Sequence, residues 1–292
     1  MLEYKLRFGP SGNDKLFYIE GNKKSVEAPN WISKKGLSLY EYSFGRGIRL
    51  KEETARKIGE EARNFNIFLT VHAPYYVNFA NPEKEKIEKS INYIVKTAYY
   101  AKLMGAKKIV VHPGSQLKMD RKTAFANTLN NFKLLVSRLK QEKLDSIYIC
   151  PETMGKTMQI GTLDEIIELS KIDKMLIPTI DFGHINAFNQ GILKNEEDFD
   201  KIFKKLKTNL SLEKFNNLHI HFSKIMYTQK GEKQHLTLDD NHYGPDEVVF
   251  LRSLIKNMED KSNITVVCES QNIMAQDALK LKKKYLDIIK GE

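Results

Sequence analysis

Short apolar runs alternate with longer amphipathic segments along the chain, and no stretch rich in Pro, Gly or Ser divides it into parts. The apolar runs predict strands over 2–8, 37–44, 67–71, 108–112, 146–150, 175–181, 217–222 and 264–268. The amphipathic segments predict helices over 25–34, 50–64, 81–105, 121–143, 163–171, 196–206, 245–258 and 275–289. Continuous apolar strands are typical of parallel sheets that are covered on both faces.

Eight predicted strands that alternate with eight helices indicate an α/β protein, a single (β/α)8 TIM barrel that takes in residues 1–292 as one domain. The usual size of this barrel, about 250 residues, suits a chain of 292 residues better than two separate domains do. An open, doubly wound parallel sheet is the alternative fold.

Six consecutive predicted strands end in residue types that bind divalent metals. These ends read TVHAPYY, VVHPGS, ICPETMG, TIDFGH, LHIHFSK and VVCESQN, and they contribute His72, His112, Glu152, Asp181, His184, His219, His221 and Glu269. In a TIM barrel the carboxyl ends of all strands meet at one face, where active sites lie. Carboxylates and imidazoles gathered there need compensation for burial and repulsion, and divalent cations supply it most simply.

The types and number of these ligands predict the metal and the chemistry. Nitrogen and oxygen ligands without thiolate suit zinc, with manganese or iron as alternatives, and they outnumber what one tetrahedral ion needs. Closely spaced ions generate hydroxide near neutral pH and stabilise the attacking and leaving oxygens of a phosphodiester. We therefore expect metal-assisted phosphoester hydrolysis. A metal-dependent sugar isomerase or epimerase is the main alternative, and a nucleic-acid-binding scaffold without full activity is a third.

The same motifs, taken in order over residues 67–270, resemble those of the endonuclease IV family, zinc-dependent apurinic/apyrimidinic endonucleases within the xylose-isomerase-like barrels. The resemblance implies a DNA-repair enzyme that cleaves double-stranded DNA on the 5′ side of abasic sites, leaving a 3′-hydroxyl and a 5′-deoxyribose phosphate. It also implies that Glu152 is catalytic and is shared by two zinc ions. The implied zinc ligands are His72, His112 and Glu152 for the first ion, Glu152, Asp181, His221 and Glu269 for the second, and His184 and His235 for the third.

The sequence departs from the family pattern at the third zinc site. The family places an aspartate two residues before the loop histidine that corresponds to His235, and here that residue is Lys233. Glu232, shifted inward, Asp239 and Asp240 are the candidate replacements. The resemblance therefore implies two or three zinc ions per chain.

Residues that follow the strand ends supply the expected DNA contacts. The resemblance implies that a tyrosine just after His72, Tyr75 or Tyr76, enters the duplex beside the lesion, and that Arg46 or Arg49 acts as an inserted arginine. An aromatic side chain suits this role because it stacks on exposed bases and fills the gap left by an extruded sugar.

Composition narrows the class of protein further. A hydrophobic content of 41% excludes a disordered chain. The 47 Lys and Arg against 37 Asp and Glu give a net charge of +10, which favours a polyanionic partner such as nucleic acid; a lysine-rich thermophilic protein or a merely soluble surface gives a similar total. Cys150 and Cys268 form no CxxC pattern and support neither a disulfide framework nor a cysteine zinc site. This cysteine pattern suits the reducing cytoplasm, where we expect the protein to be a monomer. No apolar run approaches the roughly 18 residues that span a bilayer, so we expect no membrane contact. We expect His219 to be a buried, hydrogen-bonded residue one layer below His221, and His242 to be a loop residue.

Overall fold

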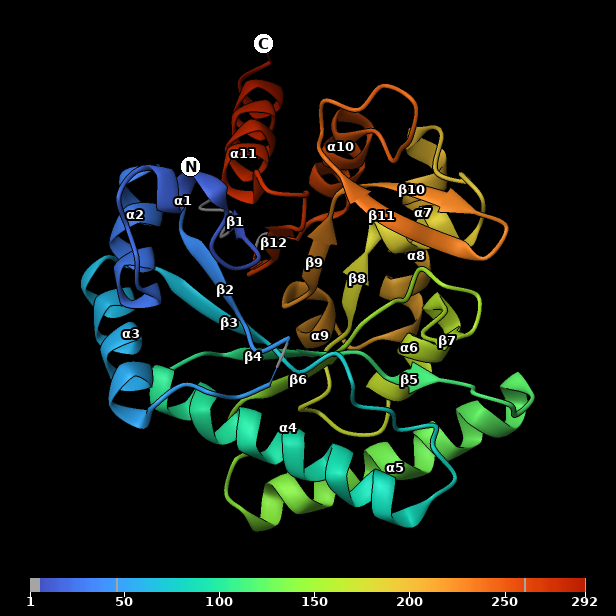
Figure 1. The fold of residues 1–292 in the computed structure, drawn as a ribbon. Helices are drawn as coiled ribbons and strands as arrows, with labels where there is room; N and C mark the ends of the chain where they lie inside the picture. The colour runs from blue at the N-terminus through green and yellow to red at the C-terminus, as the bar shows by residue number, and fades with distance from the viewer. Residues whose placement is uncertain (1–5, 46, 260, 292) are drawn as a thin grey trace.

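The computed structural model describes residues 6–45, 47–259 and 261–291, and in these ranges eight parallel strands close into a barrel (Figure 1). One half of the barrel has the strand order β2-β3-β4-β6, and the other has the order β1-β12-β9-β8. Isolated bridges join the halves, from Ser11 to Glu41 on one side and from Glu152 to Thr179 on the other. The barrel strands are β1 (Arg7–Pro10), β2 (Leu39–Ser43), β3 (Phe68–His72), β4 (Lys108–Val111), β6 (Tyr148–Pro151), β8 (Thr179–Asp181), β9 (His219–Phe222) and β12 (Thr265–Cys268). The predicted TIM barrel is confirmed.

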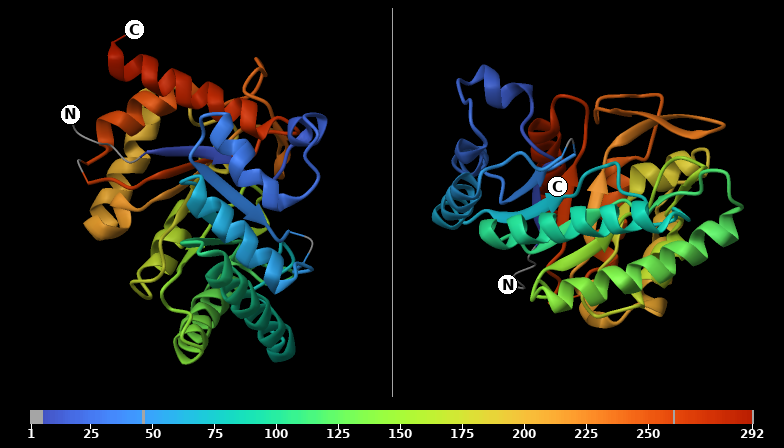
Figure 2. Two further views of the ribbon diagram at one scale, coloured as in Figure 1. Left: turned by 90° about the vertical axis from the view of Figure 1, so that its left-hand side faces the viewer. Right: turned by 60° about the horizontal axis from the view of Figure 1, so that its bottom comes forward.

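Helices form an outer ring around these strands, as the two views of Figure 2 show. In α3 (Glu52–Asn64) the buried residues Ala55, Ile58, Gly59 and Ala62 share one face, as the amphipathic pattern predicted. The other helices are α1 (Lys15–Ile19), η1 (Ser25–Glu27), α2 (Ala28–Lys34), α4 (Lys84–Met104), α5 (Arg121–Gln141), α6 (Leu163–Ser170), α7 (Phe182–Phe188), α8 (Glu196–Asn209), α9 (Leu212–Asn216), α10 (Glu247–Asn257) and α11 (Met274–Lys290). Among the described helices, none combines the length and the apolar character that crossing a membrane requires.

Aromatic packing holds the barrel wall near its carboxyl end on the side of β8 and β9. The ring of Phe182 lies 4.9 Å from that of Phe250, which in turn lies 4.6 Å from that of Phe222 on β9. Phe199 and Phe203 of α8 complete the cluster, and all five side chains are fully buried. Because Phe182 directly follows β8, this packing fixes the chain where it leaves the barrel.

Several parts of the chain differ from the prediction, among them the short helices α1, α7 and α9, which were not predicted. The segment after β9, predicted as a loop, is an antiparallel hairpin of β10 (Lys224–Thr228) and β11 (Gly231–Leu236) that carries His235. Its residues are mostly polar because it lies at the rim of the barrel, so it gives no apolar run to detect. A second short pair, β5 (Gly114–Ser115) with β7 (Gln159–Ile160), also lies outside the barrel. The first predicted strand began at residue 2, but residues 1–5 lie outside the described ranges and β1 extends to Pro10.

Closure of the barrel between β1 and β2 depends on a glycine. A Cβ added at Gly9 would lie 1.8 Å from the carbonyl oxygen of Leu39 on β2. We expect Gly9→Ala to lower the free energy of unfolding by about 3 kcal/mol, the upper end of overpacking costs, as measured by urea denaturation. Gly21→Ala is the control, because Gly21 has a φ of 92° but no neighbour within 4 Å, so only a conformational cost of about 1 kcal/mol applies. Equal losses in the two variants would contradict the steric explanation.

Candidate metal centre

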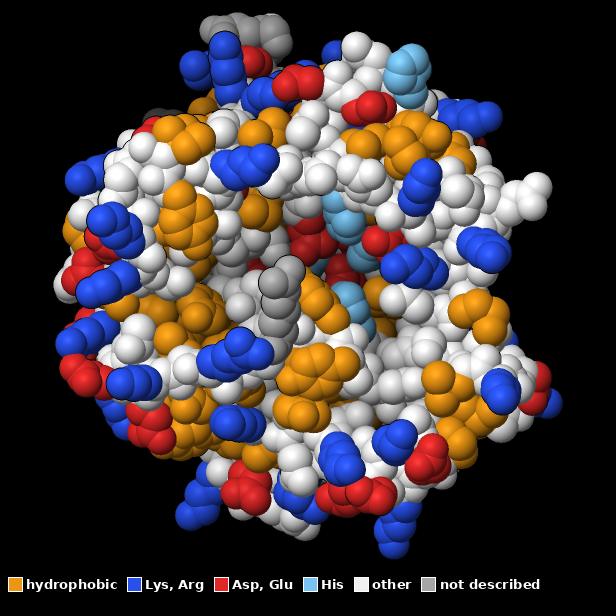
Figure 3. All heavy atoms as spheres, viewed as in Figure 1, with side chains coloured by type: hydrophobic (Ala, Val, Ile, Leu, Met, Phe, Trp, Pro, Cys, Tyr) orange, Lys and Arg blue, Asp and Glu red, His pale blue; other side chains and the backbone are white. Residues whose placement is uncertain are grey.

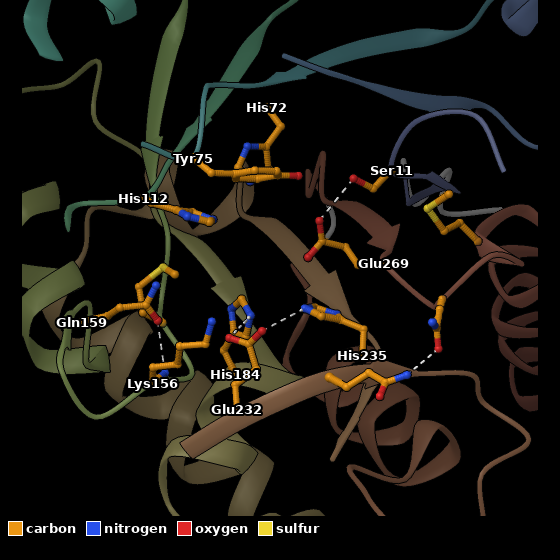
Figure 4. A pocket seen from close by; sticks show the side chains of 14 residues that line it. Ser11, His72, Tyr75, His112, Lys156, Gln159, His184, Glu232, His235 and Glu269 are labelled. Carbon is orange, nitrogen blue, oxygen red and sulfur yellow. Dashed lines mark hydrogen bonds and ion pairs between the residues drawn. The ribbon is translucent and has the colours of Figure 1, made fainter. Parts of the chain in front are cut away.

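The carboxyl ends of the barrel strands surround a pocket of about 620 Å³. Acidic and histidine side chains lie at the floor of this hollow, and Lys and Arg side chains are spread over the surface around it (Figure 3). Figure 4 shows His72, His112, His184, His235 and Glu269 among the side chains that line it. In the described part of the chain, three groups of His, Asp and Glu at this pocket have ligand atoms within 4.8 Å of one another.

The first group consists of His72, His112 and Glu152, from the ends of β3, β4 and β6. Nε2 of His112 lies 2.9 Å, and Nε2 of His72 3.5 Å, from Oε2 of Glu152. Nδ1 of His72 lies 2.8 Å from the carbonyl oxygen of Ala73. A carbonyl only accepts, so this nitrogen carries the proton and Nε2 presents its lone pair to the group.

The second group consists of Glu152, Asp181, His221 and Glu269. The register of β8 and β9 places Asp181 opposite His221, which brings both side chains to the same level of the barrel. Nδ1 of His221 lies 2.9 Å from Oε1 of Glu152 and 3.2 Å from Oε2 of Glu269. Glu152 therefore belongs to both groups and offers a different oxygen to each.

The third group consists of His184 on α7 with Glu232 and His235 on β11. The carboxylate of Glu232 lies between the imidazoles, with Oε2 3.4 Å from Nε2 of His184 and Oε1 3.6 Å from Nε2 of His235. The close approach requires a glycine, because a Cβ at Gly155 would lie 2.7 Å from Cβ of Glu232 and 2.9 Å from Cδ2 of His184. Asp181 joins this group to the second, since its Oδ1 accepts a hydrogen bond from the backbone N–H of His184 at 2.8 Å and caps α7.

The structure distinguishes the candidate replacements for the missing aspartate. Lys233 is exposed and lies between Glu232 and His235, residues of β11 whose side chains face the pocket. Asp239 pairs with Lys280 at 2.6 Å, and Asp240 accepts hydrogen bonds from backbone N–H groups of its own loop. Glu232 is the one of the three that faces the histidines.

Burial and mutual attraction shift the pKa values of these groups. Burial alone would raise the pKa of Glu152, but the surrounding His221, His112 and His72 hold it well below its usual range. Burial, with Glu152 and Glu269 nearby, raises the pKa of Asp181. The imidazoles thus stabilise the carboxylate form of Glu152, and a divalent cation can supply the same stabilisation.

Two buried oxygens indicate that the residues fit divalent cations. Oε2 of Glu152 and Oδ2 of Asp181 have no hydrogen-bond partner among the described residues. A buried carboxylate oxygen without a partner is costly, and a cation at its ligand distance removes the cost. The donor set of imidazoles and carboxylates, without thiolate, suits borderline metals.

Of the described residues predicted to contact DNA, Tyr75 lines the pocket. Tyr75 is 50% exposed, and its ring stacks on His112 with centroids 5.3 Å apart and an angle of 28°. Tyr76 is 52% exposed and packs on Tyr93. Arg46 lies outside the described residues. Tyr75 is thus the aromatic side chain that borders the ligand groups directly.

One residue of the site was missed by the sequence reasoning. Glu41, on β2, is fully buried, and with His219 and His221 it forms a fourth group of potential ligands beneath the second. His219 is fully buried and hydrogen-bonded there, with its Nε2 2.8 Å from Glu41, and burial lowers its pKa to about 4. The available signal was a lone carboxylate inside the apolar run LSLYEYSF.

This fold and this arrangement define an enzyme of the TIM-barrel class with ligands for divalent cations at its strand ends. The chain belongs to the xylose isomerase-like TIM barrel family, whose model matches residues 30–286. An uncharacterised protein of Methanocaldococcus jannaschii is 33% identical over 287 residues, 98% of this chain and 99% of that protein.

Other relatives carry functional names. The probable endonuclease 4 of Thermosipho africanus is 28% identical over 182 residues, which are 60% of this chain and 62% of that protein. The resemblance to the endonuclease IV family is thereby confirmed. Among solved structures, endonuclease IV from Thermus thermophilus aligns with a TM-score of 0.64 at 18% identity, covering 99% of this chain and 100% of that one. A 3-keto-D-glucoside 4-epimerase from E. coli aligns with a TM-score of 0.66 at 13% identity, covering 97% of this chain and 99% of that one, so structural likeness shows the fold alone.

The raised histidine pKa values predict how pH affects the metal-free protein. Burial opposes the charge of His235, but Glu232, Glu269 and Asp181 outweigh it and raise the pKa to about 9. This stabilisation is complete below the ordinary pKa of 6.5 and is lost as pH rises through 9. With a chelator present, we expect the free energy of unfolding to fall between pH 6.5 and 9 in urea denaturation. His235→Gln should weaken this fall, and a wild-type stability that is constant over the interval would contradict the assignment.

Proposed function

We propose that the protein is a zinc-dependent DNA-repair endonuclease that hydrolyses the phosphodiester on the 5′ side of abasic sites in double-stranded DNA and leaves a 3′-hydroxyl and a 5′-deoxyribose phosphate. The observation that carries the proposal is the presence of three ligand groups at one pocket, two of which share Glu152. The relatives named probable endonuclease 4 support it.

The chain's own residues account for the main requirements of this reaction. Zinc ions held by the three groups would supply Lewis-acid stabilisation of the phosphodiester oxygens and an activated water. Glu152 sets the spacing of the first two groups, because its oxygens lie 2.9 Å from His112 and 2.9 Å from His221. The backbone carbonyls of Ala73 and Thr153 hold the rings of His72 and His184 with Nε2 toward the pocket.

Other residues of the pocket suit a damaged duplex. Tyr75 is half exposed beside His112, and its ring can stack with an unpaired base. Lys156 and Gln159 also line the pocket, where a cation and an amide can contact phosphate oxygens. These contacts need no base identity, in keeping with a lesion that lacks a base.

A metal-dependent sugar epimerase is the second candidate function. Solved epimerase structures share the fold, and the second group alone, with Glu152, Asp181, His221 and Glu269, would hold the single ion that such a reaction needs. It leaves His72, His112, His184 and His235 without a shared purpose. Metal content separates the candidates: about three zinc ions per chain supports the endonuclease, one or two manganese or magnesium ions the epimerase, and none the scaffold.

The shared carboxylate provides the direct test of activity. We expect the zinc-loaded protein to incise a duplex with a single abasic site, and a chelator to abolish the incision. Glu152→Gln should reduce incision to background while circular dichroism shows a folded barrel, because one uncharged amide cannot serve two ligand groups. Glu53→Gln, an exposed change on α3, is the matched control. Near-normal turnover in Glu152→Gln would refute the assignment.

The position of Glu232 predicts the occupancy of the third group. We expect Glu232→Gln to lower the zinc content from three ions to two after dialysis, because His184 and His235 alone leave the third ion with two protein ligands. Lys233→Gln changes the exposed neighbour and should keep three ions. Three ions in Glu232→Gln, or two in Lys233→Gln, would show that the replacement of the family aspartate is a different residue.

A further inference from the structure

The barrel interior directly below the proposed metal ligands is polar. Glu41, Thr70, Lys108, His219 and Thr265 project from five different strands or their ends and are all fully or almost fully buried. Burying charged and polar groups in a barrel core is costly unless each has a partner. The hydrogen-bond partners of these five side chains therefore indicate the role of this layer.

The hydrogen bonds in this layer form a chain in which each group donates to the next, from Lys108 to Glu41. Nζ of Lys108 donates to Oγ1 of Thr265 at 2.9 Å. The hydroxyl of Thr265 is then free to donate, and Nδ1 of His219, at 2.7 Å, is closer to it than the Leu218 carbonyl at 3.5 Å. His219 consequently carries its own proton on Nε2, which lies 2.8 Å from Oε2 of Glu41.

Glu41 ends this series because a carboxylate can only accept hydrogen bonds. Thr70 donates to its Oε2 at 2.9 Å, whereas the single hydroxyl proton of Ser11 is closer to Glu269, at 3.2 Å, than to Oε1 of Glu41, at 3.4 Å. Nε2 of His221 lies 3.1 Å from Oε1 of Glu41. This buried nitrogen has no well-aligned hydrogen bond among the described residues. Without a cation, Nδ1 donates to Oε1 of Glu152 at 2.9 Å. If Nδ1 instead binds a cation, the proton of the neutral His221 ring must lie on Nε2, where the carboxylate of Glu41 can accept it in a hydrogen bond.

We propose that Glu41 is a positioning residue of the metal centre, which accepts the Nε2 proton of His221 in a hydrogen bond and fixes the ring so that Nδ1 presents its lone pair to a cation held with Glu152 and Glu269. Nδ1 lies 2.9 Å and 3.2 Å from the oxygens of those two residues, on the side opposite Glu41. Histidines that bind metals commonly donate their other N–H to a carboxylate in this way. The inference rests on the proposed function of the second group as a metal site.

Glu41→Gln tests the proposal with little change in volume. Its amide nitrogen would place a donor against Nε2 of either His219 or His221, so one imidazole must turn or change tautomer. We expect the affinity of the second site for zinc to fall by about 10- to 100-fold in competition with a chromophoric chelator. In the zinc-loaded protein labelled with ¹⁵N-histidine, the wild type should show His221 protonated on Nε2, and the variant should lose that signal; the chain has seven histidines to assign.

Controls separate positioning from a structural role. Thr70→Val removes one donor but keeps the carboxylate, so it should retain wild-type zinc affinity and the His221 signal. Unfolding temperatures measured with excess chelator report any structural loss in each variant. His219→Gln frees Glu41 from its other imidazole and should weaken zinc binding in the same direction, which keeps the test available if Glu41→Gln does not fold.

The possible outcomes distinguish this inference from the proposed function. A wild-type protein that binds no divalent metal at the second group overturns the proposed centre itself. Wild-type zinc binding that is unchanged in Glu41→Gln, with His221 still protonated on Nε2, overturns the positioning role alone. One additional zinc ion that is lost in Glu41→Gln overturns it as well, because Glu41 would then be a ligand.

Discussion

Glu152 lies fully buried at the end of β6, where one carboxylate oxygen faces His112 and His72 and the other faces His221. The mouth of the barrel is organised around this shared charge. An isolated buried carboxylate would cost several kcal/mol, so the strands that carry the imidazoles must end at the same height. The hydrogen-bonded register of β4 with β6 and the bridge between Glu152 and Thr179 provide that alignment. The ligand geometry is therefore a property of the barrel as a whole.

Much of this arrangement could be predicted because strands and ligands have local signals. Continuous apolar runs marked the strands, and a polar residue directly after each run marked the mouth. The fold and the convergence of His72, His112, Asp181 and His221 follow from those two facts. The role of Glu232 was less accessible, because side-chain direction on β11 depends on pairing with β10 and on the space left by Gly155. Glu41 was missed because periodicity treats one charge in an apolar run as an exception, while its partners come from strands distant in sequence.

The barrel interior has two layers with different physical requirements. At the mouth, carboxylates and imidazoles have unsatisfied atoms, such as Oδ2 of Asp181, that leave room for cations. One layer down, Thr70, His219 and Thr265 have partners among themselves and with Glu41. The lower layer resists rearrangement because each of these groups would lose a buried hydrogen bond on moving, which costs about 1–3 kcal/mol per group. The upper layer can thus change its protonation or its ligands without disturbing the strands.

The β10–β11 hairpin brings Glu232 and His235 to the pocket from outside the barrel. Within the described residues, β11 pairs with β10 and is tied to the barrel loops through the bridge of Gly231 with Lys156 and the bond from the Glu232 N–H to the Gly155 carbonyl. The first two groups are positioned by strand register, whereas the third is positioned by the length and twist of a surface ribbon. Lengthening or retwisting this ribbon would alter the width of the entrance and the geometry of one ligand group while the barrel stayed the same. The chain thereby combines a rigid floor, formed by the first two ligand groups, with an adjustable wall.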